Sequence, residues 1–275
     1  MHAEPWHLTD SAPVRVDQRL SEDDLVRFCS EFLPRTPMCE RFVNEARFGL
    51  ARLLPILSSF NGNNLDILEV GAGHCILSAY LASRKLRVTA VEPLGPEVDF
   101  FANLQHRVVD FCRQNAIVLN LVRTRGEQLD LPAQFDIAFT INALEHMHDP
   151  LATIDNMYGS LKPGGILLAH CPNYTIPFEV HFNVLLVTRS KPLNELLYRS
   201  KIDRDPQIWN GLNFIRYIDV RRHLVRRGFR FSFNHSVMCD LVIRTLSDRI
   251  FADRMPSVVH VVGRLLQSIG LVKAL

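Results

Sequence analysis

The sequence lacks the features that mark exported, disulfide-bonded or strongly charged proteins. Its six cysteines lie far apart, without the paired spacing of a zinc or redox site, which fits a reducing compartment. The net charge of +2 gives no general case for nucleic-acid binding. Residues 1–17 show no basic start or apolar run typical of a secretory signal, and no apolar stretch approaches the roughly 20 residues that span a membrane. We therefore expect a soluble, cytoplasmic protein.

The most informative segment predicts a strand, a glycine turn, a helix and a second strand. Residues 66–70 are apolar enough for a buried strand, and Gly71 and Gly73 follow it directly. The second strand, at 87–91, ends next to Glu92, whose carboxylate can accept two hydrogen bonds from a ribose diol. This order of elements is typical of a site for an adenosine-bearing cofactor.

Strand and helix patterns continue to alternate along the chain. The predicted elements are strands at 66–70, 87–91, 117–122, 135–141 and 165–170, and helices near 75–84, 97–114, 150–160 and 219–227. The alternation predicts an α/β fold with a doubly wound, mostly parallel sheet and helices on both faces. Two further helices, from Ser21 to Pro34 and at about 38–58, precede the sheet, with Pro55 placed to kink the second.

We divide the chain into four regions. They are an N-terminal arm and helical cap at 1–60, a cofactor-binding core at 61–171, an inserted substrate lid at 172–215, and the C-terminal part of the core with a helical tail at 216–275. The lid is predicted because roughly fifty residues, many of them aromatic, follow the fifth strand, where 2 to 6 are usual. In the tail, residues 241–275 predict one or two helices interrupted at Pro256.

Five separated motifs occur in the order typical of one family. They lie at 66–73, 88–92, 126–136, 142–150 and 161–165. With them, residues 64–171 resemble the class I S-adenosylmethionine-dependent methyltransferases, especially the quinone-biosynthesis and related small-molecule group, and 214–229 match more weakly. Cys75 departs from this pattern because it occupies the third glycine position. The antiparallel strand that closes the family's sheet is not evident either, and 237–243 is its one candidate segment.

The resemblance implies S-adenosylmethionine as the cofactor and names the residues that hold it. They are Glu69, Gly71, Ala72 and Gly73 around the methionine part, Glu92 at the ribose, Glu127 with Gln128 at the adenine, and Asn142 at the methionyl group. A carboxylate at position 92 also disfavours a 2′-phosphorylated cofactor. Alternative roles stay open: Glu69 can cap backbone amides instead, and Glu127 can be a solvated loop acid.

Methyl transfer to a hydroxyl needs an aligned acceptor, exclusion of water and a base. The resemblance places His146 at the carboxyl edge of the sheet, so it is the first candidate base, with His148 and His181 after it. Tyr174 can orient a hydroxyl or carbonyl group. Alternatively, His146 holds a loop in place through a side-chain hydrogen bond, and Tyr174 is an ordinary turn residue. We predict no metal site at 145–149, because histidines two residues apart share a face only on an extended segment.

The predicted function is methylation, on oxygen, of a small acceptor that is apolar or lipid-like. A basic run follows the lid and consists of Arg216, Arg221, Arg222, Arg226, Arg227 and Arg230. Its default interpretation is a solvated helix face, and the alternative is peripheral membrane contact through this helix and the tail. Two other functions stay open. One is a methyltransferase-like scaffold without turnover. The other is an NAD-dependent oxidoreductase, which would need a third glycine and a catalytic Tyr-Lys pair, neither of which is evident here. The sequence does not indicate the oligomeric state.

Overall fold

The computed structural model describes residues 20–60, 64–93, 99–188, 190–234 and 264. Contacts divide the chain into two units, residues 1–171 and 172–275. The predicted arm, the candidate closing strand at 237–243 and nearly all of the tail lie outside the described residues. No helix in the described part is both long enough and apolar enough to cross a membrane.

The first unit is built on a parallel sheet with the strand order β3-β2-β1-β4-β5. Its strands are β1 (Asp66–Val70), β2 (Arg87–Val91), β3 (Leu119–Val122), β4 (Phe135–Ile141) and β5 (Leu161–His170). The chain starts in the middle of the sheet, moves to one edge and then crosses to the other. This is the doubly wound arrangement, so the predicted fold class is confirmed. The order also places the ends of β1 and β4 side by side at the switch point, where ligands bind in such sheets.

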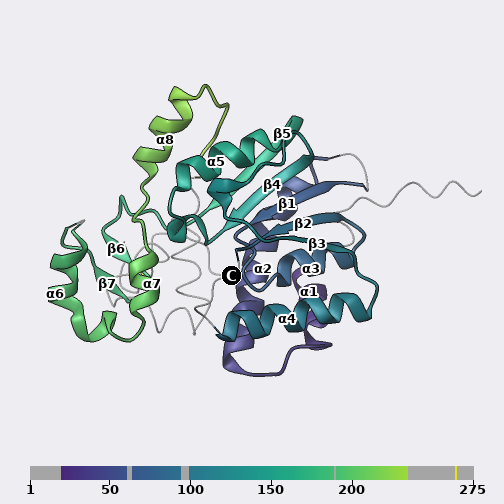
Figure 1. The fold of residues 1–275 in the computed structure, drawn as a ribbon, viewed down its shortest axis with the longest axis horizontal. Helices are drawn as coiled ribbons and strands as arrows, with labels where there is room; N and C mark the ends of the chain where they lie inside the picture. The colour runs from purple at the N-terminus through teal and green to yellow at the C-terminus, as the bar shows by residue number, and fades with distance from the viewer. Residues whose placement is uncertain (1–19, 61–63, 94–98, 189, 235–263, 265–275) are drawn as a thin grey trace, which may run out of the picture. The chain divides into compact units, whose positions relative to one another are not determined.

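Helices cover both faces of the sheet (Figure 1). On one face lie α1 (Glu22–Ser30), α2 (Pro37–Leu57), α3 (Ile76–Ser83) and α4 (Asp99–Gln114), and their apolar side chains share one core with Ile67 and Phe139. On the other face, α5 (Pro150–Gly159) packs Met157 against Leu68 and Ala138. Alternate residues of the strands thus enter opposite cores, which explains why the strands are apolar throughout.

Strand β5 differs from its prediction. The sequence of Leu161 to Gly165 predicts a tight turn before a strand at 165, whereas the strand already begins at Leu161. The pairing is irregular there, because Phe135 faces Leu161 while Ile137 faces Ile166. Gly164 adopts φ +84°, a conformation that favours glycine. The turn residues therefore form a bulge inside the strand.

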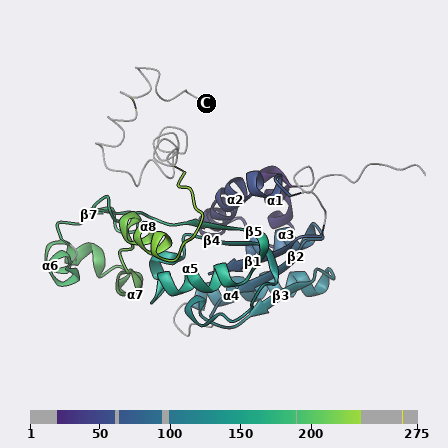
Figure 2. The ribbon, with the colours of Figure 1, turned by 90° about the horizontal axis from the view of Figure 1, so that it is seen from above.

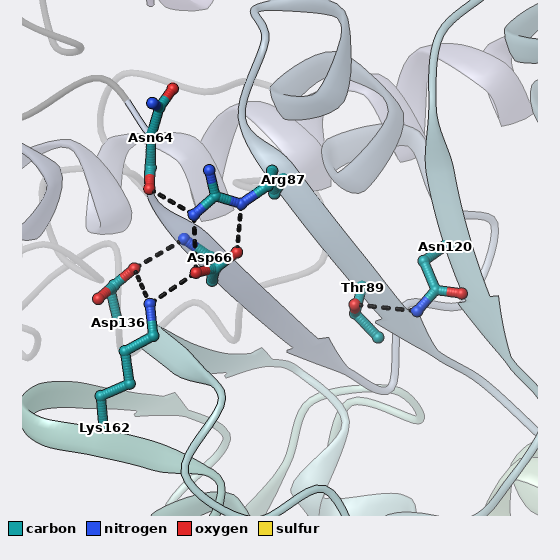
Figure 3. A network of polar contacts seen from close by, with 7 residues as sticks. All are labelled: Asn64, Asp66, Arg87, Thr89, Asn120, Asp136 and Lys162. Carbon is teal, nitrogen blue, oxygen red and sulfur yellow. Dashed lines mark hydrogen bonds and ion pairs between the residues drawn. The ribbon is translucent and has the colours of Figure 1, made fainter.

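A charged network joins the amino ends of four strands (Figure 3). Asp66 of β1 pairs with Arg87 of β2, and the Nζ atom of Lys162 lies 2.6 Å from Asp66 Oδ2 and 2.9 Å from Asp136 Oδ2. The Arg87 side chain also donates to the carbonyl of Asn64 at 2.8 Å. Hydrogen bonds from Arg87 outweigh partial burial and, with Lys162, lower the pKa of Asp66 to about 2. The network lies at the edge of the sheet opposite the glycine turn.

The second unit contains the predicted lid. Its elements are the antiparallel pair β6 (Phe178–Glu179) and β7 (Val184–Leu185), then α6 (Lys191–Ile202), α7 (Pro206–Gly211) and α8 (Tyr217–Arg226). Trp209 of α7 is buried and packs edge-on against Phe182 and Phe214. Helix α8, predicted as part of the core region, is grouped by its contacts with this unit. The lid's role in binding an acceptor stays a prediction.

Candidate functional site

The glycine turn after β1 is docked on the end of β2. The N–H groups of Gly71 and Ala72 both donate to the carbonyl of Val91, at 2.9 and 3.1 Å. Gly71 has φ +77°, and a Cβ atom there would lie 2.4 Å from the Cβ of Ala143. Any side chain at position 71 would therefore push the turn away from the loop that follows β4. The turn stays flat against the carboxyl edge of the sheet because glycine allows both the angle and the close approach.

Glu92 faces this turn. Its Oε2 atom accepts a hydrogen bond from the N–H of Gly73 at 2.8 Å, and its Oε1 atom receives none from the described residues. Burial raises the pKa of Glu92, although the Gly73 N–H and the positive charge of Arg123 oppose that effect. A carboxylate with one oxygen fixed by the backbone and the other available is suited to a diol. The site therefore fits the ribose of an adenosine-bearing cofactor.

Glu69 lies beneath the turn and is buried. Its Oε2 atom accepts a short hydrogen bond from the hydroxyl of Ser78, in the first turns of α3. Burial raises the pKa of Glu69 to about 8, and the charge of Glu92 adds to the rise. Burial therefore favours the protonated form of Glu69, and a positive charge bound nearby would favour its ionisation.

Cys75 shows how the turn accommodates a residue where the family has a third glycine. It adopts φ 61°, in the left-handed region, at a cost of about 1 kcal/mol for a side-chain-bearing residue. Its thiol is buried, which raises the pKa of Cys75 far above its usual value. Gln105 of α4 holds the segment because its amide nitrogen donates to the carbonyl of Gly73 and lies 3.5 Å from the Cys75 sulfur. The sequence motifs contain no signal for Gln105.

Asn142 follows β4 at the same edge of the sheet. It has φ 51°, which asparagine tolerates better than most residues. Its N–H donates to the carbonyl of His170 at 2.8 Å, and its Oδ1 atom lies 3.2 Å from Nδ1 of His170. His170 itself packs edge-on against Phe48, with ring centroids 4.9 Å apart. The orientation of the Asn142 amide thus depends on His170, which the motifs do not identify.

The adenine segment forms a short 3-10 helix, Gly126–Gln128. Gly126 packs so closely against Thr153 of α5 that a Cβ atom would lie 2.6 Å from the threonine methyl carbon. The amide of Asn156 donates to the carbonyl of Gly126 at 3.1 Å. Glu127 is half-buried and Gln128 is exposed. Both follow β3, so the predicted cofactor residues come from segments after β1, β2, β3 and β4.

His146 lies on another short 3-10 helix, Leu144–His146, directly after β4. Its side chain is exposed, as is that of His148. This places His146 at the carboxyl edge of the sheet, as the resemblance implies. Its role as a base stays a prediction.

In the second unit, Tyr174 and His181 both form hydrogen bonds with Glu179, a residue that the sequence motifs do not identify. The Oε1 atom of Glu179 lies 2.6 Å from Nδ1 of His181 and accepts the hydroxyl of Tyr174 at 3.1 Å. Its Oε2 atom accepts the N–H of Phe182 at 2.7 Å. Glu179 is the last residue of β6, and His181 lies in the turn that follows the strand. No motif or strand periodicity in the sequence identifies this contact.

Hydrogen bonds and charge favour the ionised form of Glu179 despite its burial. Its side chain is 0% exposed. Burial alone would raise the pKa of Glu179, but the hydrogen bond and charge of His181, with the N–H groups of His181 and Phe182, lower it below its usual value. Because a carboxylate only accepts hydrogen bonds, the Nδ1 atom of His181 that faces Glu179 carries a proton.

Comparison with known proteins gives a family match over the sheet. Residues 68–167 match the family model described as "Methyltransferase domain". An uncharacterized protein of Mycobacterium tuberculosis (strain H37Rv) is 30% identical over 195 residues, which are 68% of this chain and 65% of that protein. A ubiquinone biosynthesis O-methyltransferase of Rickettsia felis is 25% identical over 121 residues, which are 44% of this chain and 47% of that enzyme. The chain thus spans less than two thirds of the length of these relatives.

Proposed function

We propose that the whole protein, whose residues 68–167 match the methyltransferase-domain model, transfers the methyl group of S-adenosylmethionine to an oxygen atom of a small apolar acceptor. The proposed binding of the methyl donor, S-adenosylmethionine, rests on one observation. The N–H of Gly73 fixes one oxygen of Glu92 near the switch point of the sheet. The glycine turn and the acid that would bind a ribose are thereby joined in one site.

The residues of the first unit have separate roles in this proposal. Glu92 binds the ribose hydroxyls, Glu127 the adenine amino group, and the turn with Asn142 the methionine part. When bound, the cofactor supplies an electrophilic methyl group on a positively charged sulfur. Glu69, whose pKa burial raises to about 8, can lose its proton when this charge arrives and can then stabilise it.

The acceptor half rests on the cluster at Glu179. In its neutral form, with Nδ1 protonated toward Glu179, His181 would take the proton of a hydroxyl at Nε2 while the acceptor's oxygen bonds to the methyl carbon and that carbon's bond to sulfur breaks. Glu179 then stabilises the positive imidazolium ring, and Tyr174 keeps the carboxylate in place. The name of the Rickettsia relative, an O-methyltransferase, supports oxygen as the acceptor atom. His146 is the second candidate base.

A methyltransferase-like scaffold without turnover is the main alternative. Labelled S-adenosylmethionine is incubated with the purified full chain and a cell extract, and the small-molecule fraction is searched for label. We expect label in an apolar molecule that carries a hydroxyl group, and none when Glu92→Ala replaces the wild type. If the wild type binds the cofactor but labels nothing, the scaffold alternative is right and the proposed activity is wrong.

A further inference from the structure

Helix α6 of the second unit buries the polar residue Asn194 and exposes its leucines. Asn194 is 0% exposed, whereas Leu196 and Leu197 are 77% and 53% exposed and Leu193 is also exposed. Residues three and four apart share one face of a helix, so these leucines form a single stripe. A helix on the surface of a globular protein normally shows the opposite arrangement.

Hydrogen bonds fix this orientation of the helix. The side chain of Asn194 accepts the N–H of Val187 at 3.1 Å and donates to the carbonyls of Thr188 and Ser190 at 2.7 and 3.0 Å. Glu195 accepts the indole N–H of the buried Trp209 at 2.8 Å. Rotating α6 to bury its leucines would break all of these bonds. The outward stripe is therefore built into the unit.

Figure 1 and Figure 2 both show β7 and α7 beside α6. The segment after β7 is attached to the inward side of the helix, through the bond from the N–H of Val187 to Asn194. We call the outward stripe formed by Leu193, Leu196 and Leu197 the leucine face. Single exposed apolar residues are ordinary, but three on one face of a helix mark an interaction surface.

The segment that contains the leucine face has a surplus of basic residues. Residues 184–204 contain five Lys or Arg residues and two acids. The Nζ atoms of Lys191 and Lys201 donate to the backbone carbonyls of Asn210 and Asn183 at 2.8 and 2.9 Å. Arg199 is 84% exposed, and its partner Asp203 lies 3.7 Å away. An apolar face with a surplus of basic residues complements an anionic lipid surface.

We propose that the leucine face docks on the surface of an anionic lipid bilayer. The leucines enter the boundary between headgroups and acyl chains, while Arg199 remains at the headgroups. The contact is peripheral, because no described helix can cross a membrane. The proposal concerns where the protein works and does not depend on methyl transfer.

Flotation of the full chain with vesicles tests this. The wild type is mixed with phosphatidylcholine vesicles and with vesicles that also contain phosphatidylglycerol. The test variant is Leu196→Gln with Leu197→Gln, and the control is Val118→Gln, which changes a single valine of the first unit that is 83% exposed. Because all three side chains are exposed, the variants should fold, and circular dichroism checks this.

We expect the wild type and the control to float with the anionic vesicles, more weakly as salt rises, and the double variant to bind about tenfold more weakly. Equal binding by wild type and double variant would overturn the proposal, as would absence of wild-type flotation. If sedimentation shows that the double substitution dissociates an oligomer without changing flotation, the face binds a second copy and the lipid proposal is wrong.

Discussion

At the scale of single residues, the two acids beside the glycine turn accept hydrogen bonds from different donors. Glu92 is held by the N–H of Gly73, and Glu69 by the hydroxyl of Ser78. Burial raises the pKa of both carboxyls, for Glu69 to about 8. A bound cation would favour ionisation of both groups, so these residues determine how strongly a sulfonium-bearing ligand binds.

Glu92→Ala should weaken the binding of S-adenosylhomocysteine by about 10- to 100-fold. The substitution removes a charged acceptor from the ribose hydroxyls and leaves the N–H of Gly73 without its partner. Isothermal titration calorimetry measures the change. Asp110→Ala, which removes an exposed acid of α4, is the matched control and should bind like the wild type. Equal affinities for all three proteins would show that Glu92 does not contact the ligand.

The pH dependence of stability should reveal the protonation of Glu69. Its pKa in the folded protein, about 8, exceeds the ordinary value of 4.5, so folding takes up a proton between these pH values. Stability from this group is therefore lost as pH rises from about 4.5 towards 8. Glu69→Gln removes this loss, so its Tm relative to that of the wild type should rise from pH 5 to pH 8. A constant Tm difference across this range would mean that Glu69 is already ionised.

Glu179→Gln should lower kcat by about 100-fold while changing KM little, once an acceptor is known. The amide cannot stabilise a positive imidazolium ring and can present the wrong group to His181. Tyr174→Phe, which leaves the carboxylate in place, should cost less. The ¹⁵N shifts of the His181 ring report which nitrogen carries the proton, and they should change only in Glu179→Gln. Unchanged turnover and shifts in that variant would contradict the role assigned to Glu179.

At the scale of elements, the amino ends of the strands carry charge and the carboxyl ends carry the site. Lys162 lies between the carboxylates of Asp66 and Asp136, which belong to neighbouring strands (Figure 3). Without it, two acids would face each other at the start of β1 and β4. The network therefore fixes the sheet at one edge while the opposite edge remains available for ligands.

Lys162→Met should lower the free energy of unfolding by about 1–3 kcal/mol. Urea titration measures the loss, and Arg113→Met, which breaks an exposed ion pair on α4, should cost much less.

Because the folded pKa of Asp66 is lowered to about 2, its stabilising effect is complete above about pH 4 and is lost as pH falls towards 2. Wild type and Lys162→Met should therefore converge in stability in acid. A gap that stays constant down to pH 2 would contradict this account of the network.

At the scale of the whole molecule, the positions of Gly71, Glu92 and Asn142 at the carboxyl edge of the sheet were predictable because each residue directly follows a strand. Strands β1, β2 and β4 have the predicted bounds, and the strand order places their ends together. Gln105 and His170 could not be found in this way, because each acts on a residue about thirty positions away in sequence. The bulge in β5 was missed because a Pro-Gly-Gly sequence is typical of a turn, and sheet pairing overrode that preference.

Binding of S-adenosylhomocysteine to the full chain tests the central claim most directly. Isothermal titration calorimetry with this ligand should show saturable binding at one site, whereas a nicotinamide dinucleotide should give no binding heat, because Glu92 and the turn at Gly71 to Gly73 fit an adenosine that carries a methionine group. Absence of binding by S-adenosylhomocysteine, or saturable binding of the dinucleotide in its place, would contradict the account.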